Sequence, residues 1–283
     1  MANPQLITLT PATASLGADP LTLTVLGSGF TSDATVSLNG VALTTVFVSV
    51  TQLTASVTAP LLALSGAYPV SVAQAGSGVP VPVNTLTFLV PNPIDLATLA
   101  DVRAYAGSND PTKNGDDPLL QSLITGISQY WLTRTGRGSL NSVVTHNERY
   151  SGNGKDSLML RYYPIVSVVS LSIDEEEQAP SPDYQQAGFV IDSTIDSIVL
   201  IGGDFGYSKL SVAVSYTAGY AQVPWDIADA VRKQVAINFK RKGTLDQGTV
   251  NYPQTGGMTS YRSWEVPPEV ERVIQSYRRS VPN

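Results

Sequence analysis

The sequence predicts two domains: an all-β sandwich, then an α+β domain that is mainly helical and carries a small insertion of β-strands. The chain has 283 residues, more than the about 100–200 of most single domains. Its first part consists of short segments with a period of two, and helical periodicity starts only after residue 95. Lys and Arg are absent from residues 1–92, and the first of them is Arg103. We therefore predict domains at residues 1–92 and 93–283.

Alternating segments separated by Gly, Pro, Asn and Ser recur between residues 4 and 90, which is typical of β-sandwiches. They are LTLTVLG (21–27), ATVSLNG (34–40), TQLTASV (51–57), YPVSVAQ (68–74) and NTLTFLV (84–90). The chain has no cysteine, so the stability of a sandwich must come from packing between its two inner faces. Residues 91–95, PNPID, are expected to form a Pro-rich hinge between the domains.

Several motifs in this segment match one known type of domain. Asn39-Gly40 predicts a type I′ hairpin turn, and Ile7 and Pro11 precede a turn at Gly17. The other motifs are LTVLGSGF (23–30), V-x-L-N-G (36–40), V-S-x-T-x-L-T-A (48–55) and G-x-Y-x-V-x-V (66–72). Together they resemble the IPT/TIG immunoglobulin-like domains. The resemblance implies an immunoglobulin-like sandwich that acts as a binding or spacer module.

The ends of four helices are recognisable in the second domain. Thr98 is placed as the N-cap of a first helix, and Gly107 ends it. Asp117-Pro118 opens a second helix, in which Gly126 predicts close packing against a neighbour. Its apolar face carries Leu120, Leu123, Ile124, Ile127 and Trp131.

The most periodic helix begins near Pro224, which suits a first turn, and is expected to stop at Gly243. Its apolar stripe consists of Ile227, Val231, Val235 and Phe239. Residues 244–265 lack periodicity and are expected to form an arm. A last short helix starts at Pro267-Pro268. Its apolar face carries Val270, Val273, Ile274 and Tyr277.

The period changes to two between residues 142 and 218, which predicts a block of strands. Pro164 must lie at an edge or a bend of the long run, because proline cannot donate to a sheet. The strand-like runs are 143–152, 157–174, 188–193, 196–203 and 210–216.

The order helix, helix, strands, long helix, arm and final helix resembles the gp6-like head–tail connectors, or adaptors, of tailed bacteriophages. The motifs that carry the resemblance are LATLADVRAYAG (96–107), D-D-P-L-L-Q-x-L-I-x-x-I-S (116–128), ERYSG (148–152), LMLRYYPIVSVV (158–169), V-S-Y-T-A-G-Y-A-x-V-P-W-D-I-A-D-A-V (214–231) and PEVERVIQSYRR (268–279). They cover residues 96–281. The N-terminal sandwich is not part of the basic family pattern and is expected to be a decoration. The loop DEEEQAPSPD (174–183) replaces a usually short turn.

The resemblance implies a structural protein of the virion neck, made in the host cytoplasm. Such proteins form a ring, commonly of twelve copies, below the portal protein. The ring extends the DNA channel, without sequence-specific binding, and supports the next neck or tail protein. The C-terminal segment tends to dock into the portal. We therefore assign portal docking to four residues: Arg272, Tyr277, Arg278 and Arg279.

The charge is distributed unevenly, which suggests different partners for different faces. The net charge of −6 comprises −2 in residues 1–92, −9 in residues 93–231 and +5 in residues 232–283. The acidic run Asp174, Glu175, Glu176 and Glu177 is interpreted as a solvated turn; it lacks the ligand spacing of a calcium loop. In a connector, this loop would face the channel and repel the passing DNA.

No motif predicts catalysis, a cofactor or a metal. His146 is the only histidine and no cysteine accompanies it, which argues against a zinc site; a strand residue with a local hydrogen bond is expected. The sequence lacks a P-loop and a nucleophile elbow. We also expect no signal peptide and no membrane span. Two alternatives remain open: a carbohydrate- or surface-binding protein acting through the IPT-like domain, and an IPT-bearing polysaccharide enzyme with paired carboxylates.

Overall fold

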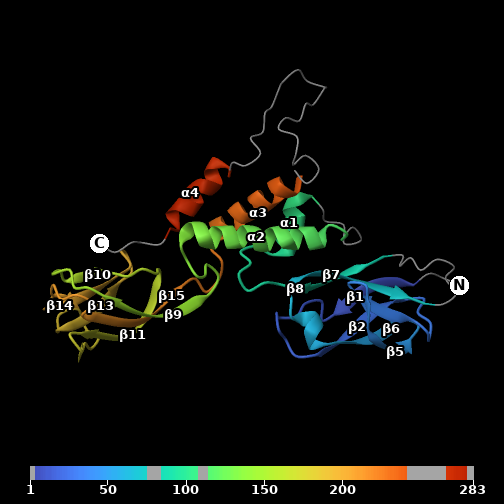
Figure 1. The fold of residues 1–283 in the computed structure, drawn as a ribbon, viewed down its shortest axis with the longest axis horizontal. Helices are drawn as coiled ribbons and strands as arrows, with labels where there is room; N and C mark the ends of the chain where they lie inside the picture. The colour runs from blue at the N-terminus through green and yellow to red at the C-terminus, as the bar shows by residue number, and fades with distance from the viewer. Residues whose placement is uncertain (1–3, 75–83, 108–113, 241–265, 279–283) are drawn as a thin grey trace, which may run out of the picture. The chain divides into compact units, whose positions relative to one another are not determined.

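The computed structural model describes residues 4–74, 84–107, 114–240 and 266–278 (Figure 1). Contacts divide the described residues into two compact units. One contains the residues up to Ser128 together with those from Val231 to Lys240. The other contains Gln129–Ala230 and the residues from Val266 onward.

The first unit begins with a β domain made of two antiparallel four-stranded sheets. The strand order is β1-β2-β6-β5 in one sheet and β4-β3-β7-β8 in the other. A short 3-10 helix, Ala59–Leu62, lies between β6 and β7. The strands are β1 (Gln5–Thr10), β2 (Leu21–Ser28), β3 (Thr35–Leu38), β4 (Val41–Ala42), β5 (Thr44–Ser49), β6 (Gln52–Val57), β7 (Gly66–Ala73) and β8 (Leu86–Val90).

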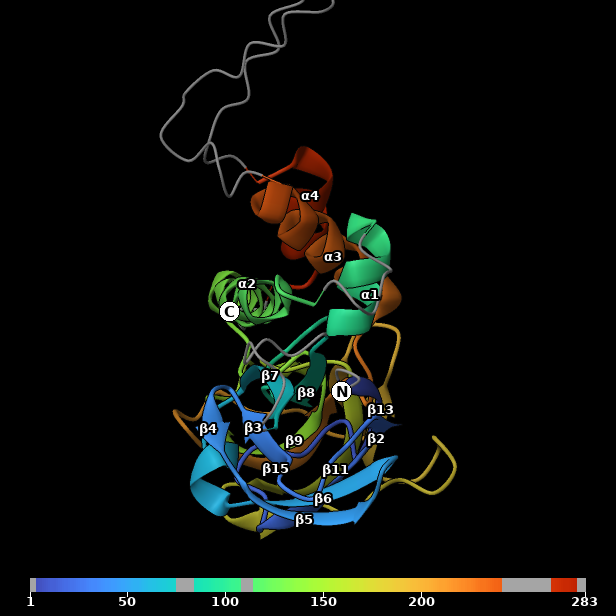
Figure 2. The ribbon, with the colours of Figure 1, turned by 90° about the vertical axis from the view of Figure 1, so that its right-hand side faces the viewer.

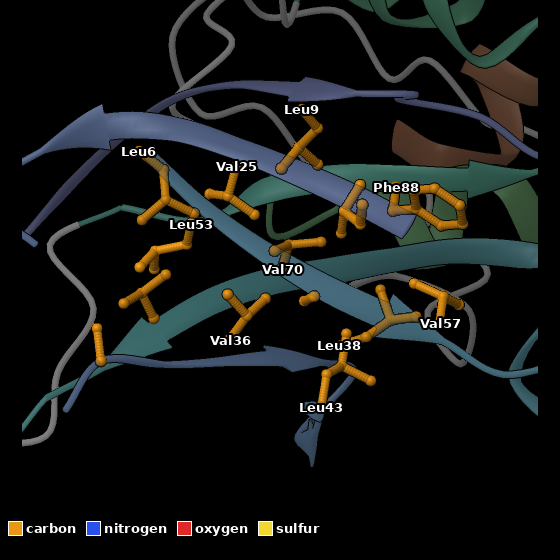
Figure 3. Packing of buried hydrophobic residues seen from close by; sticks show 14 of the residues in the cluster. Leu6, Leu9, Val25, Val36, Leu38, Leu43, Leu53, Val57, Val70 and Phe88 are labelled. Atoms are coloured by element: carbon orange, nitrogen blue, oxygen red, sulfur yellow. The ribbon is translucent and has the colours of Figure 1, made fainter. Parts of the chain in front are cut away.

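Alternate residues of both sheets point into one shared core (Figure 3). Val25 and Leu53 come from the first sheet, Val70 and Phe88 from the second, and all four are fully buried. The Asn39-Gly40 turn is confirmed, because both residues have positive φ, 50° and 79°, between the paired strands β3 and β4. The five strand-like runs predicted in this domain correspond to β2, β3, β6, β7 and β8.

Residues 91–95, expected to be a hinge, form a turn that is held by hydrogen bonds. The Asn92 backbone N–H donates to Asp95 Oδ2 over 3.0 Å, and Ile94 N–H donates to Asn92 Oδ1 over 3.2 Å. The Asn92 side chain also donates to Ser65 Oγ in the β domain. The two prolines thus belong to an ordered connection.

The second unit contains two further sheets with the orders β12-β11-β15-β9 and β10-β14-β13. Their strands are β9 (Val143–Tyr150), β10 (Ser157–Met159), β11 (Ile165–Ile173), β12 (Glu176–Glu177), β13 (Gly188–Asp192), β14 (Ser197–Ile201) and β15 (Val212–Gly219). The run expected over 157–174 is divided between the two sheets, and Pro164 lies just before β11, outside the strand. Buried side chains from both sheets, such as Leu171, Ile198 and Tyr216, form one core.

Four helices complete the described chain: α1 (Leu99–Ala106), α2 (Asp117–Thr135), α3 (Trp225–Lys240) and α4 (Pro268–Ser276). The predicted caps of α1 are confirmed: Thr98 Oγ1 accepts the Asp101 backbone N–H, and Gly107 is left-handed with φ 78°. Pro224 lies one residue before α3, where its carbonyl accepts the Ala228 N–H. Gly243 and the arm at 244–265 lie outside the described residues.

One expectation about α2 is wrong. Gly126 is exposed, and no described atom lies within 4 Å of the position that a Cβ would take. The predicted apolar face is otherwise confirmed, because Leu120, Ile124 and Trp131 are buried.

The architecture is an N-terminal β domain followed by an α+β domain. The mainly helical character expected for the second domain is not confirmed, because its sequence also forms the seven strands β9 to β15, which make up two sheets. Pairing between strands distant in sequence builds these sheets, and periodicity alone underestimates them.

Candidate assembly surfaces

The C-terminal end of α4 is anchored to the start of α3 by Tyr277. Its hydroxyl donates to Asp226 Oδ1 over 2.8 Å. Its ring meets the ring of Tyr220 edge-on, with 5.7 Å between centroids. Burial, and secondarily the hydrogen bond to Asp226, raises the pKa of Tyr277. Tyr277 is therefore protonated at neutral pH and holds α4 within its own subunit.

Arg137, which follows α2, supports the same anchor and was not identified from the sequence. Its side chain is buried, with 5% exposed, and lies 3.7 Å from the centroid of the Tyr163 ring. Its Nε donates to the Tyr277 carbonyl over 2.7 Å, and its Nη1 donates to the Tyr163 carbonyl. The Tyr163 hydroxyl in turn donates to the Arg278 carbonyl over 2.6 Å. Arg137 and Tyr163 thus bind two successive backbone carbonyls at the end of α4, those of Tyr277 and Arg278.

A surface ion pair adds a weaker tie between α2 and α4. Arg134 Nη2 lies 2.5 Å from Glu271 Oε1, but both side chains are substantially exposed. Such pairs contribute little because water and salt screen them. The buried Arg137 contacts are therefore the main polar link.

The four residues assigned to portal docking have different environments. Tyr277 is half-buried and engaged inside the subunit. Arg272 and Arg278 are exposed, and Arg278 Nη1 donates to Gln275 Oε1 over 3.2 Å. Arg279 lies outside the described residues. Of the described members, only the two arginines present their side chains to solvent.

The acidic run forms the tip of a hairpin between β11 and β12. Asp174 and Glu175 have φ of 49° and 71°, and Ile173 pairs with Glu176 across them. This is the geometry of a two-residue type I′ turn. All four acidic residues, including Glu177, are exposed, so the interpretation as a solvated turn is confirmed.

A shallow polar groove of about 390 Å³ lies beside this hairpin. Asp174, Glu176 and Asp204 contribute carboxylates to it, and Gly202 and Gly203 contribute backbone. Throughout the described part of the chain, no group of three or more His, Cys, Asp or Glu residues could hold a metal ion. The groove is an electronegative surface.

Glu148 forms a second polar network that sequence reasoning missed. Its Oε2 accepts the hydroxyls of Tyr150 and Tyr216 over 2.5 and 2.8 Å, and its Oε1 accepts Arg161 Nη1 over 3.2 Å. Burial, followed by the Glu148 hydrogen bond, raises the pKa of Tyr150 to about 12. The tyrosines are thus permanent donors, and the network joins β9, β15 and the segment after β10.

His146 lies in β9, as expected, but its described contact is a ring stack instead of a hydrogen bond. Its ring is parallel to that of Tyr162, with 4.0 Å between centroids and 7° between planes. Burial lowers the pKa of His146, although the nearby Glu148 opposes the shift. This environment favours a neutral, packed imidazole.

The β domain is joined to α2 through buried polar side chains of the first unit. Thr85 Oγ1 donates to Asn114 Oδ1 over 2.7 Å, and Thr87 Oγ1 donates to Asp117 Oδ2. Asn114 and Asp117 are buried, with 6% and 1% exposed. Arg103 Nη1 lies 3.3 Å from Asp117 Oδ2. Removing the β domain would leave both buried groups without these partners.

Several large apolar side chains of the second unit are exposed. Trp225 is 76% exposed at the start of α3. Val166 and Val169 of β11 are 54% and 66% exposed, at two irregularities in its pairing with β15. Within the described residues, no helix is both long and apolar enough to cross a membrane.

Comparison with protein-family models gives two matches. Residues 95–280 match the head completion protein family. Residues 4–89 match the IPT/TIG domain. A comparison with curated proteins gives no match.

Solved structures also match parts of the chain at low sequence identity. A chain from the neck of an empty GTA particle, computed with C6 symmetry, is 19% identical with a TM-score of 0.40, covering 67% of this chain and 92% of that chain. A chain from the neck of a native GTA particle, computed with C12 symmetry, is 18% identical with a TM-score of 0.38 and the same coverage. An auxiliary nutrient binding protein from Bacteroides thetaiotaomicron VPI-5482 is 12% identical with a TM-score of 0.23, covering 75% of this chain and 39% of that chain. At these scores the likenesses carry no argument about function.

Proposed function

The chain belongs to the head completion protein family, and we propose that it is a head–tail connector of a tailed phage or a phage-like particle. The match over residues 95–280, which include all four helices and β9 to β15, is the observation that carries this function. The connector sits below the portal, extends the DNA channel and provides the platform for the next neck or tail protein. Its work is assembly, and it performs no catalysis and needs no cofactor.

We infer that copies of the chain form a closed ring of twelve below the portal. Exposed apolar residues of the second unit, among them Val166, Val169 and Trp225, support contacts between copies, because large exposed apolar surfaces mark interaction sites. Cyclic symmetry requires that one surface of each subunit meet a different surface of the next. The ring would be a component of the virion neck and would assemble in the host cytoplasm.

We propose that Arg272, Arg278 and Arg279 carry the contact with the portal. The buried Arg137 and the Tyr277 hydroxyl hold the end of α4 in place, and this supports a role for α4 as a preformed docking element. Exposed arginines at its end would recognise carboxylates on the partner through charge complementarity. Tyr277 would act by positioning this helix.

The acidic hairpin at Asp174–Glu177 is our candidate for a channel-facing surface. Four exposed carboxylates at the tip of a hairpin would repel the phosphate backbone and let DNA pass without sequence-specific binding. The net charge of −9 in residues 93–231 supports this assignment.

The IPT/TIG segment would be an immunoglobulin-like sandwich that acts as a peripheral contact module. A carbohydrate-binding role has no support, because the aromatic side chains available for stacking on a sugar are buried or half-buried. These are Phe30, Phe47, Tyr68 and Phe88.

Reconstitution with the portal tests the proposed function. The purified chain is mixed with the portal protein of the same particle and imaged by electron microscopy. We expect a ring-shaped density bound to one face of the portal ring. Mixtures in which the two proteins never associate would contradict the connector function.

A further inference from the structure

The four-stranded sheet β12-β11-β15-β9 of the second unit carries a shallow groove on its solvent face. Its strands β11, β15 and β9 lie side by side (Figure 1 and Figure 2). Alternate residues of β15, such as Val214 and Tyr216, are buried in the core, so the residues between them face solvent. Both rows of outward residues described next line the groove, whose volume is about 310 Å³. The register places them across three strands: Ser170, Ser215 and Asn147 in one row, and Ser172, Ala213 and Arg149 in the other.

The residues of this groove are small, and its rim carries one cation. Apart from Asn147 and Arg149 on β9, both rows consist of serine and alanine, so no long side chain of the same copy fills the space. The groove volume lies at the lower end of the about 300–1,000 Å³ of ligand pockets, which suits one large side chain. Arg149 is exposed and forms no ion pair with any described residue. Because a guanidinium stacks on aromatic rings, and best on tryptophan, the groove favours an indole as its occupant.

Trp225 is an indole of this chain that its own copy leaves uncovered. It is 76% exposed, whereas Trp131, the other described tryptophan, is fully buried. It does not line the groove of its own copy. The start of α3, where it lies, is held in place because Asp226 accepts the Tyr277 hydroxyl over 2.8 Å. Asp229 lies four residues further on the same face of α3, so this surface has a negative charge, opposite in sign to the cation at the groove.

We propose that Trp225 of one copy packs into the groove of the neighbouring copy, with its indole against Arg149. This inference rests on the proposed ring and names the two surfaces that meet in it. The indole and the groove are different surfaces of one subunit, so the contact is heterologous and can repeat around a closed ring. Val166 and Val169, which are exposed at the two irregularities of β11, add apolar surface next to the groove. Tryptophan and arginine in a desolvated pocket are typical of the residues that dominate interface energies.

Photocrosslinking of the full chain tests this contact. The photoreactive amino acid p-benzoylphenylalanine replaces Trp225, and the protein is irradiated with and without the portal protein. We expect a ladder of dimers, trimers and larger species, because a heterologous contact links each copy to the next. Mass spectrometry should locate the crosslinks in residues 147–149, 170–172 and 213–215 of another copy. The control carries the same amino acid in place of Tyr207, which is 85% exposed, and should give no ladder.

A second substitution fills the groove. Ser215→Phe, added to the photoreactive chain, should lower the crosslinked fraction at least about tenfold, because the phenyl ring occupies the place of the indole. The matched control is Ser37→Phe, at a serine of β3 in the β domain that is half-buried like Ser215, and it should leave the fraction unchanged. Circular dichroism confirms that the variants fold.

Each outcome separates this contact from the connector function. Crosslinks that stop at the dimer, that map outside the groove or that join the chain to the portal would overturn the inference, as would the absence of crosslinks. A chain that still binds the portal in these cases keeps its connector function. A ladder that maps to the groove, formed by a chain that never binds the portal, would support the inference and contradict the connector function.

Discussion

Substitution of Tyr277 by Phe tests the anchor at the end of α4. The change removes one hydroxyl, and with it the 2.8 Å hydrogen bond to Asp226 Oδ1, while it keeps the ring that packs on Tyr220. A hydrogen bond to a charged group contributes about 1.5–3 kcal/mol, and because Tyr277 is only half-buried we expect about 1–2 kcal/mol. The substitution should lower the free energy of local opening of α4 and not that of unfolding the whole chain, because multi-domain proteins do not unfold in one step.

Hydrogen exchange of residues 268–278 measures that local opening directly. A loss of about 1–2 kcal/mol corresponds to an increase of about 5–30-fold in the open fraction of α4. The matched control is Tyr207→Phe, because Tyr207 is 85% exposed and its loss of a hydroxyl should change nothing. Unchanged exchange in α4 of the Tyr277→Phe variant would refute the anchoring role of this hydroxyl.

Three further predictions concern docking, pH and the domain junction. The double variant Arg272→Glu, Arg278→Glu should no longer co-sediment with the portal, because its charges would repel carboxylates on the partner. Its circular dichroism spectrum should be unchanged. Full binding by the double variant would exclude these arginines from the contact. The pKa of His146 is lower in the folded chain than in the unfolded chain, so the unfolded chain binds the proton first as pH falls through about 6.5. The free energy of unfolding should therefore decrease over this pH range, and the decrease should be smaller in His146→Phe. Equal pH dependence of the two proteins in chemical denaturation would contradict this prediction. Thr87→Val should increase hydrogen exchange at the start of α2, because Asp117 loses a partner while remaining buried, and unaltered exchange would show that the junction does not depend on this bond.

Helix ends could be predicted from the sequence because their causes are local. The Thr98 cap and the Gly107 stop each depend on residues within one turn of the helix. The Asn39-Gly40 turn is similarly encoded by two adjacent residues. Local chemistry of this kind needs no knowledge of the rest of the fold.

Strand membership and the polar networks could not be predicted in the same way. The run 157–174 is uniformly strand-like, yet pairing with β14 and with β15 divides it between two sheets. Arg137 contacts the carbonyls of Tyr163 and Tyr277, which lie 26 and 140 residues away in sequence. No spacing rule connects positions so far apart, so the buried arginine had no recognisable signature. The portal contact assigned to Tyr277 stays a prediction, and its hydrogen bond to Asp226, 51 residues away in sequence, likewise had no recognisable signature.

The mass of the complex between this chain and its portal shows whether the chain binds there as a ring. Native mass spectrometry or mass photometry of the portal, with and without the chain, would count the copies added. We expect an increase of about 360 kDa, which is twelve copies of the 30.0 kDa chain bound as a ring. A portal that gains no mass, or that gains one or two copies without closing a ring, would contradict it.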